Sequence, residues 1–314
     1  MLAALAQIAP VLLDRETTTC KAVDAIRDAA SQGASLIAFG ETFLPAYPVW
    51  LSRTDGAHFD SSDQKELHAL YLDQAVTIER GHLNPIIEAS REHNIWIVVG
   101  IAERPPDRAG HTIYASAVTI SPTAGIASVH RKLMPTYEER LAWGVGDAHG
   151  LRAHDCQDFR IGTLNCWENW MPLPRAALQA QGVTLHIAIW PGEVANTQDI
   201  TRYIARESRA YVLSASSLIR ATDIPKSTPH RDRIVRNESE ILHNGGSAVA
   251  NPDGSWLLEP QANSEGVFIV ELDPAFVRRE RQSFDPAGHY SRPELMNLNV
   301  DRRRHTIASF KDQT

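Results

Sequence analysis

Apolar runs alternate with amphipathic stretches over most of the chain. Short apolar runs predict buried strands, and apolar residues that recur every three or four positions predict helices. In the first helix, we expect Cys20, Val23, Ile26 and Ala30 to share the buried face. The predicted strands are 2–8, 35–39, 95–102, 115–120, 126–130, 159–165, 184–189, 210–217, 246–250, 255–258 and 266–271, and the predicted helices are 16–31, 64–80, 83–93, 172–181 and 197–209.

This alternation indicates an α/β fold. The turn sequence Asn251-Pro-Asp-Gly254 lies between two predicted strands and predicts a hairpin, so the sheets should be mixed. Two mixed sheets packed face to face, with helices outside, are the expected arrangement. Because no repeat or linker divides the sequence, we predict one domain over residues 1–304, followed by a short C-terminal tail at 305–314.

Composition narrows the function. The net charge of −7 argues against nucleic acid or an anionic membrane as the main partner. The three cysteines, Cys20, Cys156 and Cys166, form no CxxC pair and leave an odd thiol, which favours a reducing compartment. The N-terminal apolar stretch has no basic segment before it, so it predicts a strand and not a signal peptide. We therefore expect a cytoplasmic protein.

Three residues with reactive side chains lie one or two positions after the end of a predicted strand: Glu41, Lys132 and Cys166. Strand ends at one edge of an α/β sheet converge in space, so we expect these side chains to meet. Together they would supply a base, a cation and a nucleophile. A thiol needs this environment to react, because the thiolate is the attacking species.

Each of these residues also has a structural interpretation. A cysteine is often a small buried apolar residue, which is the expectation for Cys20 and Cys156. Glu41 alone would be a polar residue leaving the core, and Lys132 alone would be a surface lysine. The sequence contains no HxH or HExxH pattern, phosphate loop or dinucleotide fingerprint, so we expect no metal and no cofactor.

The sequence blocks around these three residues favour the catalytic interpretation over the structural one. Residues 40–48 (GETFLPAYP), 130–140 (HRKLMPTYEER) and 165–173 (NCWENWMPL) resemble the three signature blocks of the nitrilase superfamily, and most of all its nitrilase branch. The likeness continues at 186–192, 245–254 and 288–294 and extends from Ala4 to about Arg303. The sequence departs from the usual pattern at Gly40, Ala46 and Asn165, which bears on loop shape and pocket size.

The resemblance implies a four-layer αββα sandwich with a Glu–Lys–Cys triad. In that arrangement Glu41 is the general base, and Lys132 stabilises negative charge that develops on the substrate. Cys166 attacks the nitrile carbon. The resemblance also implies a second glutamate, which best matches Glu139, and an oxyanion donor in the backbone N–H of Trp167.

Aromatic residues near these blocks are candidates for a pocket wall. Four tryptophans lie close to the blocks, at positions 50, 143, 167 and 170, and core packing is the expected role of at least two. Tyr47, Trp167 and Trp170 are the candidates for contact with a small organic substrate.

The leading hypothesis is hydrolysis of an organic nitrile to the carboxylic acid and ammonia. The alternative is an amidase or N-carbamoyl hydrolase of the same superfamily that uses the same triad. A third interpretation is a scaffold or regulatory protein that retains the fold, although the intact triad argues against it. The resemblance also implies a homodimer or higher homo-oligomer. The sequence does not indicate which nitrile is preferred.

Overall fold

The computed structural model describes residues 1–308 and contains two mixed β-sheets. The first sheet has the order β13-β1-β2-β3-β4-β5, and the second has the order β10-β11-β9-β8-β7-β6 with β12 paired to β11. The strands are β1 Leu2–Gln7, β2 Leu36–Phe39, β3 Trp96–Glu103, β4 Tyr114–Ser121, β5 Gly125–Arg131, β6 Ala153–Cys156, β7 Phe159–Asn165, β8 Leu185–Trp190, β9 Tyr211–Ser216, β10 Leu218–Arg220, β11 Ile241–Ala250, β12 Trp256–Ala262 and β13 Gly266–Glu271.

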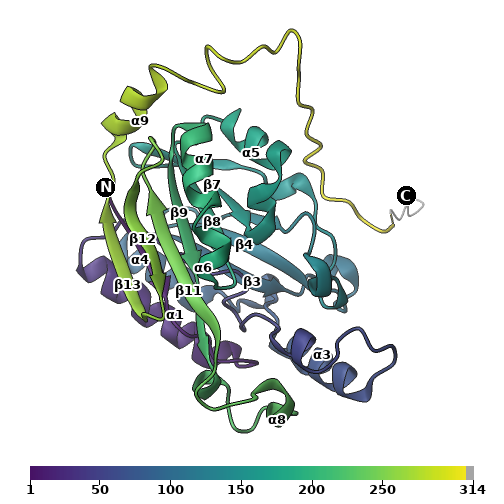
Figure 1. The fold of residues 1–314 in the computed structure, drawn as a ribbon. Helices are drawn as coiled ribbons and strands as arrows, with labels where there is room; N and C mark the ends of the chain where they lie inside the picture. Colours follow the sequence, from purple (N-terminus) through teal and green to yellow (C-terminus); the bar gives the residue numbers. More distant parts are fainter. Residues whose placement is uncertain (309–314) are drawn as a thin grey trace.

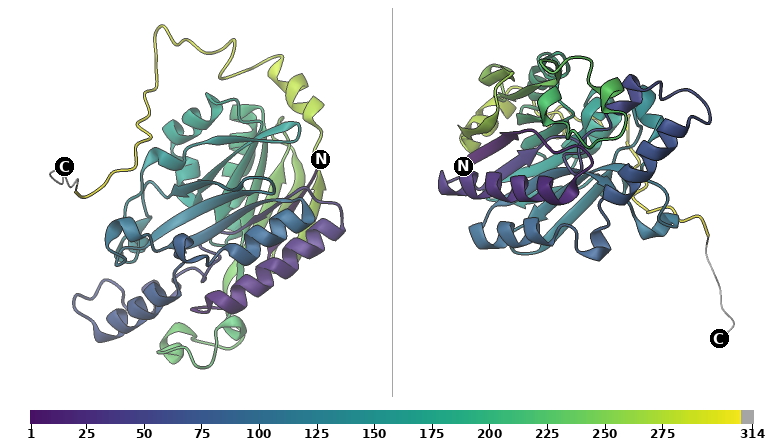
Figure 2. Two further views of the ribbon diagram at one scale, coloured as in Figure 1. Left: turned by 180° about the vertical axis from the view of Figure 1, so that it is seen from behind. Right: turned by 90° about the horizontal axis from the view of Figure 1, so that it is seen from below.

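Helices cover the outer faces of both sheets (Figures 1 and 2). The α-helices are α1 Arg15–Ser31, α2 Trp50–Arg53, α3 Ser62–Gln74, α4 Asn84–His93, α5 Pro172–Gln179, α6 Val194–Thr197, α7 Ile200–Ser208, α8 Arg231–Ile234 and α9 Pro274–Arg281. Short 3-10 helices lie at Ile78–Arg80, Pro106–Arg108, Tyr137–Leu141, Ala148–Gly150, Cys166–Trp170 and Ala221–Asp223.

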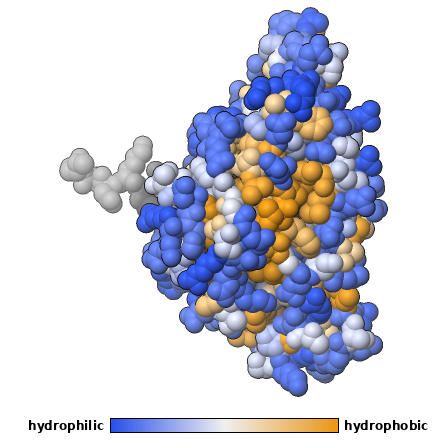
Figure 3. All heavy atoms as spheres, turned by 90° about the vertical axis from the view of Figure 1, so that its left-hand side faces the viewer, coloured by the Kyte–Doolittle hydropathy of each residue, from blue (hydrophilic) through white to orange (hydrophobic). Residues whose placement is uncertain are grey.

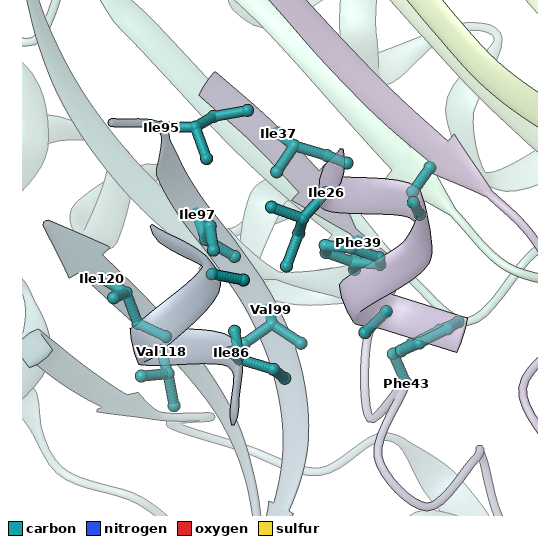
Figure 4. Packing of buried hydrophobic residues seen from close by; sticks show 14 of the residues in the cluster. Ile26, Ile37, Phe39, Phe43, Ile86, Ile95, Ile97, Val99, Val118 and Ile120 are labelled. Atoms are coloured by element: carbon teal, nitrogen blue, oxygen red, sulfur yellow. The ribbon is translucent and has the colours of Figure 1, made fainter. Parts of the chain in front are cut away.

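The two faces of the first sheet pack against different partners, because successive side chains of a strand point in opposite directions. In β2, Leu36 and Ala38 face the second sheet, where they pack with residues such as Ile187 of β8. Ile37 and Phe39 face the opposite way, toward α1 and α4. Figure 4 shows this outer layer, where Ile26 and Ile86 of the two helices meet the sheet. On the far side, α7 packs on β8 and β9. The predicted αββα sandwich is confirmed.

Most of the predicted strands and helices are present within a residue or two of the expected bounds, and β11 and β12 form the predicted hairpin. Its turn is closed by the backbone N–H of Gly254, which donates to the carbonyl of Asn251 at 2.8 Å. The periodicity did not predict the short elements β6, β10, α2 and α8, or the later helix α9.

Two predicted helices end early or divide. The helix expected over 64–80 ends at Gln74, because Val76 pairs with the end of β3. The backbone N–H of Val76 donates to the carbonyl oxygen of Ala102 at 2.7 Å. The helix expected over 197–209 is divided into α6 and α7. Here the Thr197 hydroxyl at the end of α6 donates to the carbonyl of Gly246 in β11 at 2.7 Å, which ties this turn to the sheet.

The buried face of α1 also differs from the prediction. Cys20 is exposed, and Val23 and Ala30 are only partly buried. The residues that pack on the sheet are chiefly small ones at helical spacing, namely Ala22, Ala25, Ile26 and Ala29. The prediction placed larger residues on the buried face, whereas alanine, with its small side chain, lets the helix approach the sheet closely.

The surface is hydrophilic over much of the face drawn in Figure 3, with apolar residues exposed between hydrophilic areas. Part of this face belongs to the edge strand β13, in which Val267, Phe268 and Ile269 are partly exposed. Among residues 1–308, no helix is long and apolar enough to cross a membrane. The tail predicted at 305–314 lies largely outside the described residues, and the domain boundary at 304 stays a prediction.

We predict that Ile37→Ala lowers the free energy of unfolding by about 2–5 kcal/mol, because Ile37 is fully buried on the face of the first sheet that packs against α1 and α4. Denaturant unfolding followed by circular dichroism measures the change. Ile307→Ala is the control, since that side chain is 79% exposed and should change stability by no more than about 0.5 kcal/mol. Equal effects of the two substitutions would contradict this packing.

Candidate active site

Three strand ends from both sheets build the site. Glu41 follows β2 and Lys132 follows β5, both in the first sheet, whereas Cys166 follows β7 in the second. Backbone hydrogen bonds fix two of these positions: Glu41 N–H donates to Trp190 O at 3.0 Å, and Lys132 N–H donates to Ala115 O at 2.7 Å. The site therefore lies where the two facing sheets meet.

Gly40 allows the close approach of the sheets beside Glu41. A Cβ atom at this position would lie 2.4 Å from Ser217 Oγ and 2.8 Å from the carbonyl oxygen of Trp190. Both contacts are shorter than carbon and oxygen tolerate, and the second involves backbone. A side chain here would separate the strand ends that hold the site, which gives this departure from the usual pattern a structural reason.

Four side chains meet in this space: Glu41, Lys132, Glu139 and Cys166, each no more than 2% exposed. The Lys132 ammonium lies 2.9 Å from Glu41 Oε1 and 2.6 Å from Glu139 Oε2. The Cys166 sulfur and one carboxylate oxygen of each glutamate lie within 4.8 Å of one another. The structure thus brings together all four residues that the sequence suggested for catalysis.

Glu139 is held from two further directions. The Tyr47 hydroxyl donates to its Oε1 at 3.0 Å, and the backbone N–H of Thr136 donates to its Oε2 at 2.6 Å. With the Lys132 ammonium, these contacts satisfy both carboxylate oxygens. Glu139 therefore forms an ion pair with Lys132 and is itself held by Tyr47 and Thr136.

Burial dominates the protonation of the other two acidic groups. It raises the pKa of Glu41 to about 8, although the Lys132 ammonium opposes the shift. It also raises the pKa of the Cys166 thiol well above its ordinary value, against the opposing effects of Lys132 and the backbone N–H of Trp167. Lys132 shows the reverse balance, since burial would lower its pKa but the surrounding acidic groups raise it. It therefore remains an ammonium.

Glu41, Glu139 and Cys166 together also have the donor types and spacing of a metal site. However, the position between the two glutamates is occupied by the Lys132 ammonium, which contacts both carboxylates. A metal ion there would face the positive charge of Lys132 at close range. These residues therefore suit the Lys132 ammonium better than a metal ion.

Cys166 is the first residue of the 3-10 helix Cys166–Trp170 and has a φ of +46°. Residues other than glycine rarely adopt this backbone conformation. Glu168, which is buried, holds this turn: it accepts hydrogen bonds from the backbone N–H groups of Leu133 at 2.7 Å and Asn165 at 2.8 Å. His130 Nε2 lies 3.1 Å from both of its carboxylate oxygens. Glu168 therefore ties the Lys132 segment to the Cys166 turn, and His130 belongs to this connection.

The same contacts set the charge of Glu168. Burial opposes its ionisation, but the histidine and the two backbone N–H groups hold its pKa below the ordinary value. The sequence analysis did not single out this residue. The spacing Asn165-x-x-Glu168 is a capping-box pattern and was the signal available.

A cavity of about 260 Å³ opens onto the sulfur. Tyr47 and Trp167 line it, as the sequence suggested, whereas Trp170 is not among its lining residues. The full lining is Tyr47, Val49, Ser52, Arg53, Thr136, Glu138, Glu139, Cys166, Trp167, Pro191, Glu193, Asn196, Leu242 and His243. Sequence reasoning missed Arg53, Glu193, Asn196 and His243, although the last three lie beside blocks that carry the resemblance.

Comparison with known proteins places this chain in a family. Residues 2–282 match the carbon-nitrogen hydrolase family. The chain belongs to the carbon-nitrogen hydrolase family. The predicted family is thus confirmed, as is the predicted enzyme class, a hydrolase that acts on carbon–nitrogen bonds.

Individual members of the carbon-nitrogen hydrolase family agree with this assignment. The chain is 34% identical over 309 residues to a protein named Nitrilase 2 from an unknown prokaryotic organism, covering 98% of this chain and 95% of that protein. It is 33% identical over 305 residues to an aliphatic nitrilase of Sinorhizobium fredii, covering 95% of each.

Solved structures of the same superfamily share the fold. Nit3 of Saccharomyces cerevisiae, a member of branch 10 of the nitrilase superfamily, aligns with a TM-score of 0.71 at 18% identity, over 92% of this chain and 96% of that one. An amidase from Nesterenkonia sp. aligns with a TM-score of 0.63 at 18% identity, over 90% and 94% of the two chains.

We predict that Glu168→Gln lowers the free energy of unfolding by about 1–3 kcal/mol, because an amide cannot accept from both backbone N–H groups and the histidine as the carboxylate does. Thermal and denaturant unfolding measure the loss. The matched control is Glu92→Gln on the exposed surface of α4, which should be nearly neutral. A variant at Glu168 as stable as the control would show that the turn does not depend on this carboxylate.

Proposed function

We propose that this protein is a nitrilase, which converts an organic nitrile and two water molecules to a carboxylic acid and ammonia. The supporting observation is the Cys166 sulfur within 4.8 Å of a Glu41 carboxylate oxygen, with the Lys132 ammonium 2.9 Å from that glutamate, at a cavity that a small molecule can fill. The relatives at 33–34% identity carry the name nitrilase, which favours a nitrile over an amide substrate.

In the first half of the reaction, Glu41 accepts the thiol proton and the sulfur attacks the nitrile carbon. A carbon–sulfur bond forms and one nitrile π bond breaks, so negative charge develops on nitrogen. Lys132 and the backbone N–H of Trp167 stabilise that charge. Glu41 passes the thiol proton to the nitrogen, which gives a covalent thioimidate and restores the Glu41 carboxylate. Tyr47 acts through Glu139, whose carboxylate it helps to orient.

In the second half, Glu41 removes a proton from a water molecule that adds to the thioimidate carbon. Glu41 returns this proton to the nitrogen, and the hydroxyl proton of the tetrahedral intermediate follows. Ammonia then leaves, and a thioester remains on Cys166. A second water molecule, activated in the same way, displaces the sulfur and releases the carboxylic acid. Glu41 returns the proton to the thiolate, so the enzyme is restored.

We further propose that residues 1–304 form the single domain that carries this reaction. A cytoplasmic location and a homodimer or higher homo-oligomer are part of the proposal. All three cysteines are free thiols, which fits a reducing compartment.

Removal of the sulfur tests the proposal. Cys166→Ala should reduce nitrile turnover at least about 10⁴-fold and leave the unfolding transition near that of the wild type, because the nucleophile is lost while a small buried side chain is kept. The assay measures ammonia and acid from a nitrile panel, with the matched amides offered in parallel. Cys20→Ala, which changes an exposed thiol, should keep wild-type activity. If the enzyme hydrolyses only the amides, the proposed nitrilase function is wrong and the protein is an amidase.

The proposal also predicts a pH dependence. Glu41 can accept the thiol proton only as a carboxylate, and burial raises its pKa to about 8. Below that pH the group is mostly protonated, so kcat/KM should rise with pH from 6, reach about half its maximum near pH 8 and level off above about pH 9. Steady-state rates across this range measure the profile, and kcat/KM that is constant or falls from pH 6 to 8 would exclude this role for Glu41.

A further inference from the structure

A buried amide beneath the Cys166 turn has no part in the chemistry described above. Asn169 lies on the same 3-10 helix as Cys166 and is fully buried. Its Nδ2 donates to the carbonyl oxygen of Cys166 at 2.8 Å and, less closely, to that of Leu164 at 3.4 Å. Its Oδ1 lies 2.7 Å from Nε2 of His186. Both ends of the amide therefore have partners.

These partners determine which way the amide faces. The two carbonyl oxygens can only accept, so the group beside them is the NH2. Burial lowers the pKa of His186 to about 3, so its ring is neutral at neutral pH and carries a single N–H. That proton lies on Nε2, where Asn169 Oδ1 accepts it. A rotated amide would place its oxygen against two other oxygens.

The backbone of Asn169 is anchored as well. Arg175, which is 4% exposed, donates from Nη1 to the carbonyl oxygen of Asn169 at 2.8 Å. Its Nε and Nη2 pair with Glu207 of α7 at 2.7 and 2.9 Å. His186 belongs to β8, which pairs with the strand that leads into Cys166. Asn169 is thus held from the sheet and from the outer helices.

The carbonyl that Asn169 binds belongs to the peptide unit of the expected oxyanion donor. The C=O of Cys166 and the N–H of Trp167 are two ends of one planar trans unit, so they point in opposite directions. Trp167 lines the cavity. Burial raises the pKa of the Cys166 thiol, and the N–H of Trp167 partly opposes this shift by its contact with the sulfur. A carbonyl fixed toward the core therefore leaves this N–H facing the reacting atoms.

We propose that Asn169 is a positioning residue, whose amide holds the Cys166 carbonyl and thereby orients the N–H of Trp167 toward the negative charge that develops on the substrate. This inference rests on the proposed nitrilase function and names the residue that orients its oxyanion donor. The positive φ of Cys166 persists only while neighbouring contacts hold it. A donor stabilises a transition state most when it is oriented in advance.

Asn169→Leu keeps the approximate size of the side chain and removes the donor. It should lower kcat for the best nitrile of the panel roughly 10- to 100-fold and change KM by less than about 3-fold, because the lost stabilisation arises only in the transition state. His186→Leu, which frees the amide to rotate, should reduce kcat by about 3- to 10-fold. His186→Gln supplies an N–H to the same oxygen and should restore most of the rate.

Two thiol reagents distinguish orientation of the donor from support of the whole turn. In the aldehyde analogues of the panel nitriles, the Cys166 sulfur adds to the carbonyl carbon. A carbon–sulfur bond forms, the carbonyl π bond breaks, charge develops on oxygen and Glu41 takes the thiol proton. Iodoacetamide instead alkylates the sulfur with loss of iodide, so that no such charge develops. Asn169→Leu should weaken aldehyde binding roughly 10- to 100-fold and change the alkylation rate of Cys166 by less than about 3-fold.

Mass spectrometry of the peptide that contains Cys166 measures alkylation, and protection by the aldehyde gives its Kd without any turnover. The matched control is Ser90→Ala, which removes another buried bond from a side chain to a carbonyl: Ser90 Oγ donates to Ile95 O at 2.7 Å in the outer layer. The control should lower the unfolding temperature and keep the wild-type kcat, aldehyde Kd and alkylation rate.

The outcomes separate this inference from the function on which it rests. If the wild-type enzyme hydrolyses no nitrile, the proposed function fails, and the aldehyde and iodoacetamide measurements still test Asn169. The inference is overturned if Asn169→Leu keeps the wild-type kcat and aldehyde Kd, or if its alkylation slows as much as its turnover, since Asn169 then supports the whole turn. If Asn169→Leu does not fold, the same criteria apply to His186→Leu and its rescue by His186→Gln.

Discussion

The buried ammonium of Lys132 is the interaction on which the site depends. Two glutamates and a thiol lie together with almost no solvent access, and two carboxylates alone in such a place would repel each other and resist ionisation. Lys132 contacts both of them, at 2.9 and 2.6 Å. Breaking a buried arrangement of this kind by removing one partner leaves an uncompensated charge, so its members have to be positioned together.

The sandwich meets this requirement through strand ends and not through flexible loops. Each of the three triad residues follows a strand whose neighbours fix it by main-chain hydrogen bonds, and the strands come from both sheets. The apolar layer between the sheets sets their spacing, and Gly40 permits their close approach at the site. Packing far from the cavity therefore controls distances within it.

The sequence predicted those parts of the molecule that depend on local pattern. Long apolar runs identified most strands, and the residues directly after them identified Glu41, Lys132 and Cys166. Arg53 and His243 were not predicted, because their approach to the cavity depends on how α2 and β11 pack against the rest of the fold. The buried face of α1 was misplaced at Cys20 for a related reason, since the fit of alanines against a sheet is a property of the pair and not of the helix alone.

Two fully buried glutamates of this site show how the environment can assign different tasks to the same side chain. Glu168 accepts from two backbone N–H groups and faces His130, so its pKa is lowered and it remains a fixed charge that orders the Cys166 turn. Glu41 has the Lys132 ammonium 2.9 Å from its Oε1 but, within residues 1–308, accepts from no backbone N–H, and burial raises its pKa to about 8. A carboxyl group poised in this way can gain and lose a proton near neutral pH, which is what the proposed base must do. The structural and the exchanging carboxylate are thus distinguished by their hydrogen-bond donors, and not by burial, which they share.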